Sequence, residues 1–192
     1  LTDGAAVVAA DQEIDGRIAL LDAAGRVVVG SLHFRDDWAG SERTMAVSWR
    51  PVAAPLDLGG ERPWSGVTAT AGDRGGAAAV VAWCADGHLV SASWDPEGES
   101  WVVSAPLAVT AGVSAAAIAH DLETAAIVGG DGRLSVVRLP ELAALEVEGL
   151  AEPVARARFL IGGGTLVAAG RDGMVSVLLE LPRVTVTNRA TR

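Results

Sequence analysis

The three histidines of the chain are the first candidates for chemistry. None of them has the i, i+4 spacing with an adjacent Glu that a helical zinc site needs. His88 directly follows the pair Asp86-Gly87, so we expect it to be a solvent-facing strand residue. His120 stands beside Asp121 and indicates a turn between strands. The sequence therefore predicts no metal site.

Cys84 is the only cysteine, which excludes an intrachain disulfide and a thiolate metal cluster. It ends an apolar run next to Trp83, a position typical of a small buried hydrophobe. A nucleophilic role would need a base and an electropositive setting, and the sequence indicates neither. A single free thiol fits a reducing compartment, so we expect a cytoplasmic protein.

Two further patterns resemble ligand sites only superficially. Asp11, Glu13 and Asp15 alternate, and clustered carboxylates suit Ca²⁺, but the spacing lacks the glycine and distal Glu of a calcium loop. The run 162–164 is Gly-Gly-Gly, but it lacks the Lys and Ser/Thr of a phosphate loop and does not precede a predicted helix. We interpret both as turns and predict no cofactor and no catalytic residue; a catalytic pair assembled from different repeats remains an alternative.

Tryptophan is the most prominent residue with binding chemistry, with six Trp against two Phe and no Tyr. Its ring serves both as an interface anchor and as a stacking platform for sugars. Trp83 and Trp94 fall on predicted strands and are expected in the core. The candidate binding residues, expected to be partly exposed, are Trp38, Trp49, Trp64 and Trp101. The alternative, favoured for most of the six, is that they fill the core of an Ala-rich fold.

Four segments that share one pattern must position these residues. Each has an apolar run, an Asp-Gly pair and a second apolar run, at residues 5–22, 78–95, 125–139 and 165–180. Asp-Gly between apolar runs predicts a β-hairpin, because the turn requires positive φ and glycine adopts it without strain. The predicted structural turns are Asp15-Gly16, Asp86-Gly87, Asp131-Gly132 and Asp172-Gly173.

Further strands are expected around these hairpins. One precedes three of them, beginning at Val67, Val113 and Val154, and one follows each, at residues 26–32, 100–104, 141–147 and 183–187. Four strands per repeat, with successive turn aspartates 45 and 41 residues apart in the last three copies, are typical of a propeller blade. We therefore predict an all-β β-propeller of about four four-stranded blades. The blade-like repeats span 1–32, 64–104, 113–147 and 154–187 of a single domain, 1–192.

The repeats resemble those of WD-repeat propellers. Gly130-Asp131-Gly132 and Arg171-Asp172-Gly173 are similar to the turn of that family, and Trp94-Asp95 is similar to its terminal dipeptide. Leu21-Asp22 and Leu179-Glu180 are weaker versions, and the Gly-His pair of the family is not evident. Residues 18–30 also resemble quinoprotein-type propeller strands. The resemblance implies a rigid disc that binds partners through its loops, often as part of a larger bacterial signalling or defence protein.

About thirty extra residues, 33–63, interrupt the repeats as an insertion. Residues 45–49 are expected to form a strand. We interpret the insertion as an extended loop between blades, or a decayed hairpin, packed over the propeller. The alternative is a binding loop, because long loops with aromatic residues often carry recognition.

The net charge of −9, with Arg as the only basic residue type apart from His, argues against nucleic acid and against an anionic membrane surface. We therefore expect a non-catalytic protein-interaction or sensing scaffold of bacterial origin, whose partner is another protein or the remainder of a larger chain. Two alternatives stay open. One is a propeller hydrolase or lyase with a site in the central channel, and the other is a carbohydrate- or small-ligand-binding propeller that uses Trp38, Trp64 or Trp101.

The blade count predicts an incomplete ring. The first hairpin begins at Ala5, so the strand before it is expected upstream of residue 1 and the first blade is one strand short. Unpaired sheet ends invite association. We therefore expect other chain segments or another copy, as a homo-oligomer, to complete a larger propeller. The alternative is that residues 184–187 pair beside the first blade and close a small ring.

Overall fold

The computed structural model describes residues 5–12, 16–71, 77–145, 153–160, 165–170, 173 and 175–178. About two thirds of the described residues lie in β-strands and none lies in a helix. The prediction of an all-β fold is therefore confirmed. Because the described part of the chain has no helix, it has none that could cross a membrane.

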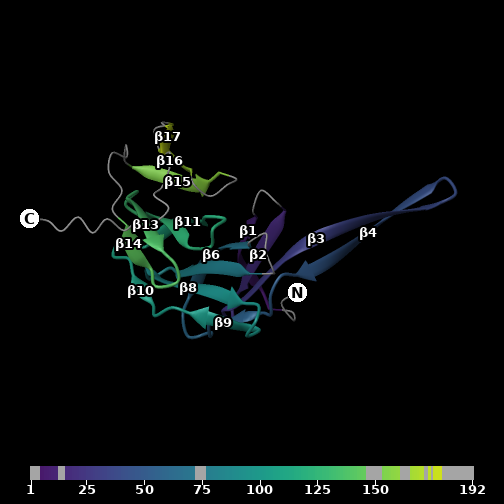
Figure 1. The fold of residues 1–192 in the computed structure, drawn as a ribbon, viewed down its shortest axis with the longest axis horizontal. Helices are drawn as coiled ribbons and strands as arrows, with labels where there is room; N and C mark the ends of the chain where they lie inside the picture. The colour runs from purple at the N-terminus through teal and green to yellow at the C-terminus, as the bar shows by residue number, and fades with distance from the viewer. Residues whose placement is uncertain are drawn as a thin grey trace, which may run out of the picture.

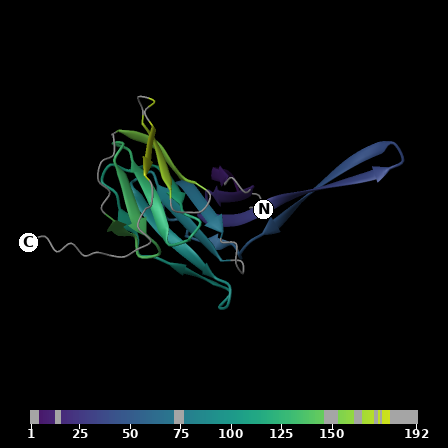
Figure 2. The ribbon, with the colours of Figure 1, turned by 45° about the horizontal axis from the view of Figure 1, so that its top comes forward.

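The strands form four antiparallel sheets, taken in chain order (Figures 1 and 2). The first sheet contains β1 (Val7–Gln12), β2 (Arg17–Asp22), β3 (Arg26–Ala39) and β4 (Glu42–Pro51), with β5 (Leu56–Asp57) paired to β3. The second contains β6 (Trp64–Ala71), β7 (Ala78–Cys84) and β8 (His88–Asp95), with β9 (Ser100–Val103) and β10 (Leu107–Ala108) each paired to β8. The third contains β11 (Val113–Ile118), β12 (Thr124–Gly129), β13 (Leu134–Arg138) and β14 (Ala143–Leu145). The fourth contains β15 (Val154–Phe159), β16 (Leu166–Gly170) and β17 (Val175–Leu178).

The four sheets repeat one backbone pattern. The first strand of each sheet shifts register near its start, at Val7/Ala9, Trp64/Gly66, Val113/Ala115 and Val154/Arg156. The turn between the second and third strands ends on a glycine with φ between 82° and 88°, at Gly25, Gly87, Gly132 and Gly173. In each turn, the glycine N–H donates to the carbonyl oxygen three residues earlier. These two landmarks assign equivalent positions in the four sheets.

Most of the expected strands are present. The strands predicted to begin at Val113 and Val154 do begin there, and Val67 lies within β6. The positive φ expected at Gly87, Gly132 and Gly173 is observed. Of the expected last strands, residues 26–32 belong to β3, residues 100–104 correspond to β9, and residues 141–147 contain β14. The strand expected at 183–187 and the turn residues Asp15 and Asp172 lie outside the described residues.

The first repeat was assigned wrongly from the sequence. Gly16 lies between β1 and β2, whereas Gly87, Gly132 and Gly173 lie between the second and third strands of their sheets. The equivalent turn of the first sheet is Asp22–Gly25, and β1 is the strand that was expected before residue 1. The first sheet is therefore not one strand short.

The reason for the misassignment lies in the position of the turn aspartate. In the other turns the aspartate precedes the glycine, and Oδ1 of Asp131 accepts the N–H of Arg133 at 3.0 Å. In the first sheet Asp22 opens the turn instead, and its Oδ1 accepts the N–H groups of Ala24 and Arg26, each at 2.9 Å. The aspartate thus bonds the turn backbone from a position outside an Asp-Gly pair.

Neighbouring sheets pack on one another through apolar cores. Side chains alternate along each strand, so each sheet has one face toward the preceding sheet, the leading face, and one toward the following sheet, the trailing face. In β7, Val80 and Ala82 share a core with the first sheet, whereas Ala79 and Val81 share a core with the third. A third core joins the third and fourth sheets. The row of sheets leaves two outward faces, the leading face of the first sheet and the trailing face of the fourth.

Candidate interaction surface

The most exposed part of the described chain is a two-stranded arm, residues 32–49, formed by the ends of β3 and β4. The two strands pair continuously from Gly30↔Pro51 to Ala39↔Glu42, whereas β2 pairs with β3 only as far as Ser31. The arm therefore extends beyond the sheet, and Figures 1 and 2 show it projecting away from the body of the molecule. Residues 33–49 of the inserted segment are therefore not packed over the body, because their strands pair with each other instead, whereas Leu56 further along the segment does pack into the core between the first two sheets.

The local sequence explains why the arm forms. Ala39 pairs with Glu42, so Gly40 and Ser41 form a two-residue turn. Gly40 has a φ of 66°, which suits the first position of a type II′ hairpin turn. The twist of such turns matches that of paired strands, and the Phe, Val and Trp residues along the arm favour extended backbone. The twist of the arm is visible in Figure 1.

One face of the arm is apolar. Cross-strand partners share a face, and the pairs Leu32↔Trp49 and Phe34↔Val47 are followed toward the tip by Met45 and Trp38. The exposed fractions are 66% for Trp38, 63% for Phe34 and 60% for Met45. The opposite face carries polar and charged side chains, at Ser31, His33, Arg35 and Asp37 on β3. The arm is thus an amphipathic ribbon with its apolar side in solvent.

The charged side chains of the arm pair with one another. Arg43 Nη2 lies 2.6 Å from Oδ2 of Asp36, and its guanidinium lies over the Trp38 ring, 5.9 Å from the centroid. Arg35 and Asp37 pair on the polar face at 3.0 Å. Exposed ion pairs of this kind add little to the free energy of folding. The Asp36–Arg43 pair nevertheless neutralises the two charged side chains that interrupt the apolar face. A partner can therefore cover that face without leaving an unpaired charge.

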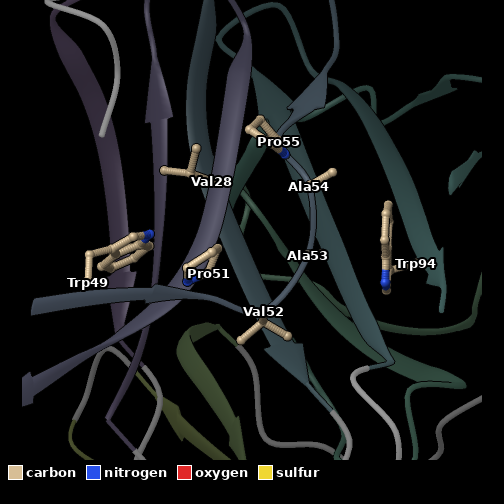
Figure 3. Close-up of a pocket in the computed structure, with 8 residues that line it drawn as sticks. All are labelled: Val28, Trp49, Pro51, Val52, Ala53, Ala54, Pro55 and Trp94. Carbon is tan, nitrogen blue, oxygen red and sulfur yellow. The ribbon is translucent and has the colours of Figure 1, made fainter. Parts of the chain in front are cut away.

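At the base of the arm, the apolar face continues into a hollow of about 460 Å³ (Figure 3). The Trp49 ring lies against Gly30, where a side chain would collide with it. Val28, Pro51 and Trp94 line the hollow together with Trp49 and residues 52–55. A second apolar groove, of about 700 Å³, lies between the second and third sheets and includes Leu107 and Ile127.

A polar contact lies at the inner edges of the sheets. The register landmarks make Asp11, Thr68, Ala117 and Arg158 equivalent positions in the first strands of the four sheets. The Asp11 carboxylate accepts hydrogen bonds from Thr68 Oγ1 at 2.6 Å and from Arg158 Nη2 at 2.8 Å. Burial raises the pKa of Asp11, but these hydrogen bonds outweigh burial and hold the pKa below its ordinary value. Asp11 therefore connects the first, second and fourth sheets.

Known proteins resemble this chain in structure but not in sequence. No known protein family matches the chain, and no curated protein matches its sequence. The computationally designed Ika4 protein matches with a TM-score of 0.52 and 15% identity, over 92% of this chain and 92% of its own. Sqt1 of Chaetomium thermophilum, a WD-repeat protein solved bound to the N-terminus of ribosomal protein L10, matches with a TM-score of 0.53 and 14% identity. That match covers 92% of this chain and 48% of Sqt1.

The fold is propeller-like. At these identities the likeness concerns the fold alone, and this chain spans about half the length of Sqt1. The described residues form four sheets and do not show a closed propeller. The sequence prediction of a β-propeller is therefore confirmed at the level of a propeller-like all-β fold, while the WD-repeat assignment and the number of blades stay predictions.

The four candidate tryptophans have different environments. Trp38 lies exposed on the arm, and Trp49 lies partly buried at its base. Trp101 is partly buried, donates its Nε1–H to the carbonyl of Ala54 at 2.8 Å and packs against Trp94. Trp64 was expected to be partly exposed, but it is 7% exposed and belongs to the core between the first two sheets. The structure therefore brings Trp49 and Trp94 to one hollow and places Trp64 away from solvent.

The reason for the burial of Trp64 is local. Its indole Nε1–H donates to the carbonyl of Gly59 at 2.8 Å. The ring also lies against Gly25, where any side chain would collide with it. Trp64 is thus the residue that fills the space beneath the Asp22–Gly25 turn.

The other candidate groups do not converge. His33 Nε2 lies 3.0 Å from Ser31 Oγ on the arm, and His88 Nδ1 lies 3.2 Å from Asp86. Cys84 is buried, and burial raises the pKa of its thiol. Within the described residues, no group of three His, Cys, Asp or Glu side chains is placed to hold a metal ion.

Sequence reasoning missed the apolar residues of the arm other than its tryptophans. Phe34, Met45 and Val47 carry much of the exposed face. The signal that identifies them is the Gly40-Ser41 pair between two runs of matching length, which predicts a two-residue hairpin turn.

Proposed function

We propose that this chain is a non-catalytic protein-interaction scaffold, a β-propeller module whose four sheets are blades and whose arm holds a protein partner. The observation that supports this most strongly is the exposed apolar face of the arm. Soluble proteins rarely expose contiguous apolar patches unless a partner covers them. Phe34 and Trp38 are the largest side chains on this face, and aromatic residues are the usual anchors of interfaces.

The apolar area that Phe34 and Trp38 offer is large enough to contribute substantially to the free energy of binding a partner. Buried aromatic side chains each remove about 150–250 Å² from solvent. Since Phe34 and Trp38 are 63% and 66% exposed, a partner would cover most of that area. At about 25 cal/mol per Å², each ring would contribute roughly 3 kcal/mol before the cost of association is subtracted.

A protein partner is also supported by the likeness to Sqt1, which binds the N-terminus of a ribosomal protein. We place the module in a larger bacterial, cytoplasmic protein or complex on the composition of the chain: Arg is the sole basic residue type besides His, and there is one free cysteine. No enzymatic activity forms part of the proposal, because the candidate catalytic groups of the described residues do not converge.

The test compares two variants of the arm. The first, Phe34→Ser/Trp38→Ser/Met45→Ser, removes the apolar anchors. The matched control, His33→Ser/Arg35→Ser/Thr44→Ser, changes the polar face of the same strands. Each protein is used as bait in a bacterial extract, and captured proteins are purified and titrated against the wild type by calorimetry.

The proposal expects a partner that binds the wild type and the control with similar affinity and binds the apolar-face variant at least tenfold more weakly. Partners that bind all three proteins equally would exclude the arm as the binding element. Turnover of a substrate that requires an intact central carboxylate, Asp11, would overturn the non-catalytic assignment.

A further inference from the structure

The outer edge of β4 is a free sheet edge. β4 is the last strand in the order of the first sheet, and among the described strands it pairs with β3 alone. All residues of β4 except Trp49 are exposed. An exposed edge strand can pair with another chain unless a proline, a bulge or an inward charge prevents it. From Glu42 to Arg50 the strand has no proline, and its register with β3 is unbroken.

The hydrogen bonding at the base of the arm shows which residues direct their backbone groups to this edge. The Val52 N–H donates to the Val29 carbonyl at 2.9 Å, so these two residues form a hydrogen-bonded pair. Such pairs alternate along an antiparallel ladder, so the even-numbered residues of β4 bond to β3. The residues whose N–H and C=O groups point to the free edge are Arg43, Met45, Val47 and Trp49. Pro51, which has no N–H, also belongs to the outward set, as a proline at a sheet edge should.

The sequence of β4 is complementary to itself. In an antiparallel pair of two β4 strands centred on Ala46, each residue lies opposite the one equally far on the other side of Ala46. The opposed residues are Glu42 and Arg50, Arg43 and Trp49, Thr44 and Ser48, and Met45 and Val47. Opposite charges, a cation beside an aromatic ring, two hydroxyl groups and two apolar side chains are all favourable cross-strand neighbours.

We propose that two copies of this chain pair through the free edges of β4, so that their arms form one four-stranded antiparallel sheet. In this register every outward residue meets an outward residue, and the unused N–H and C=O groups face each other. Four such pairs form, each exchanging two bonds, which gives about eight hydrogen bonds against the roughly ten of a typical interface. Ala46 meets Ala46 of the second copy on the two-fold axis, where the strands approach most closely and a small side chain fits.

The free edge of β3 lacks this complementarity. Because Val29 bonds toward β4, the residues of β3 that point to the opposite edge of the arm are Leu32, Phe34, Asp36 and Trp38. The first strand pair of the sheet, β2 with β3, already occupies that edge up to Ser31. A symmetric pairing over the remaining free edge centres on Arg35 and sets two Arg35 side chains opposite each other, which is unfavourable.

The charge distribution also favours contact through the arms. Residues 32–50 contain three Arg, two Asp and one Glu, so their net charge is zero and the whole −9 of the chain lies elsewhere. Because the paired arms run in opposite directions, the two acidic bodies lie at opposite ends of the shared sheet. Residues 42–50 span about 30 Å, whereas charges are screened over roughly 8–10 Å at physiological salt. Repulsion between the bodies is therefore weak in this arrangement.

Edge pairing leaves the apolar face of the arm open. Cross-strand partners share a face, so the apolar faces of the two arms join into one, with Met45 and Val47 at its centre and Phe34 of each copy beside them. Two copies would thus offer a different protein a face twice as wide. The inference goes beyond the proposed function and does not depend on it, because the second copy uses the edge and the other partner uses the face.

The mass of the purified chain, measured by light scattering after gel filtration, tests the association. We expect it to rise to twice the 19.5 kDa of one chain as the concentration increases through the micromolar range. A folded chain that stays monomeric throughout this range would overturn the inference. Capture of a different protein by that monomer would still support the proposed function, so the two failures are distinguishable.

Two proline variants identify the edge. Val47→Pro removes an N–H that points to the second copy and none that bonds β3, so it should give a folded monomer. Asp36→Pro makes the matched change at the free edge of β3 and should remain a dimer. The reverse result would place the contact on β3. Phe34→Ser/Trp38→Ser keeps the β4 edge and should also remain a dimer, and loss of that dimer would place the contact on the apolar face instead.

A charge exchange tests the register. Glu42→Arg sets two Arg pairs opposite each other in the dimer, and Arg50→Glu sets two Glu pairs opposite each other. Each variant alone should dimerise at least tenfold more weakly than the wild type. An equal mixture of the two should dimerise like the wild type, because both opposed pairs then carry opposite charges. Equal dimerisation of either variant alone and of the mixture would overturn the proposed register.

Cross-linking covers the case in which a proline variant does not fold. In a Cys84→Ala background, Ala46→Cys places two thiols opposite each other on the axis, at a spacing that a disulfide can bridge. After mild oxidation we expect at least tenfold more linked dimer than for Ser48→Cys, whose two copies lie apart in the sheet. Ser48→Cys should link to Thr44→Cys when the two are mixed. Equal linking of Ala46→Cys and Ser48→Cys alone would overturn the pairing about Ala46.

Discussion

Arg158 of the fourth sheet reaches Asp11 of the first, with its Nη1 3.3 Å from Oδ2 and its Nη2 2.8 Å from Oδ1. The two residues are 147 positions apart in the chain and occupy equivalent places in their sheets. Thr68 of the second sheet donates to the same carboxylate. Among the described residues, this contact joins the first and fourth sheets, the two ends of the row of sheets, through polar side chains.

The Asp11 contact predicts a specific pH dependence. Burial raises the pKa of Asp11, but the hydrogen bonds from Arg158 and Thr68 lower it further, so the pKa is below its ordinary 3.8 in the folded state. The contact therefore stabilises the fold above pH 3.8, and this contribution is lost as the pH falls through the folded-state pKa. Asp11→Asn should cost about 1 kcal/mol at pH 7, since Arg158 is half exposed, and the difference from the wild type should shrink as the pH falls below 3.8 toward the folded-state pKa.

Urea denaturation of the wild type and Asp11→Asn at several pH values measures this difference. The acid loss shared by the other carboxylates cancels in the comparison. A stability difference between the two proteins that stays constant as the pH falls from 7 to well below 3.8 would contradict a stabilising role for the Asp11 charge.

Two turn glycines should differ in their tolerance of substitution. Gly132 and Gly173 have φ values of 85° and 84°, so a valine at either is strained by roughly 1 kcal/mol or more. A side chain at Gly132 would also collide with Pro153, whereas no described atom lies within 4 Å of the Cβ position of Gly173. Gly132→Val should therefore lower the melting temperature more than Gly173→Val. Equal, neutral melts of both variants would mean that the turns are placed wrongly.

Trp64 and Trp38 should behave oppositely when truncated. Trp64 is buried and donates to Gly59, so Trp64→Ala should lower the free energy of unfolding by about 3–5 kcal/mol. Trp38 is 66% exposed, and Trp38→Ala should change it by less than about 0.5 kcal/mol. Trp64→Phe keeps most of the volume and should cost about 0.5–1.5 kcal/mol from the lost hydrogen bond, because Gly59 is exposed and water can replace the donor. Chemical denaturation measures all three, and a neutral Trp64→Ala would contradict the packing described.

Cys84 should be unreactive in the native protein. It is 1% exposed, and burial raises the pKa of its thiol, so little thiolate is present and reagent access is blocked. A thiol-specific chromogenic reagent at pH 8 should label it at the rate of unfolding, and at once in denaturant. Rapid labelling under native conditions would show that the core between the first two sheets opens readily.

The sequence predicts the repeating part of the fold well, because local chemistry determines it. Asp131 and Gly132 specify a turn by a side-chain hydrogen bond and a positive φ, both of which depend only on adjacent residues. Asp22 and Gly25 produce the same turn from a wider spacing, and the first repeat was therefore shifted by one strand. The backbone hydrogen bond of the turn glycine, rather than the exact sequence of the motif, is what the four sheets share.

The candidate surface was less predictable, because it depends on where a strand stops being paired. Asp36 and Asp37 are poor strand formers, so the sequence does not indicate that the strand continues through residue 39, as the structure shows. Burial of a tryptophan depends on contacts distant in sequence, such as the approach of Gly25 to Trp64. A local sequence pattern contains neither property. The exposure of the arm and the burial of Trp64 are therefore evident only from the three-dimensional structure.

The equivalence of Asp11, Thr68, Ala117 and Arg158 has a consequence for how the chain can evolve. A backbone built from four similar units tolerates duplication or reordering of those units as far as strand pairing is concerned. The side chains at this one position do not, because a copy of the fourth unit in place of the first would set two guanidinium groups against each other at the inner edge. The side chain at this position therefore differs from unit to unit, as carboxylate, hydroxyl, methyl and guanidinium in turn. This difference favours one order of the repeats within the chain.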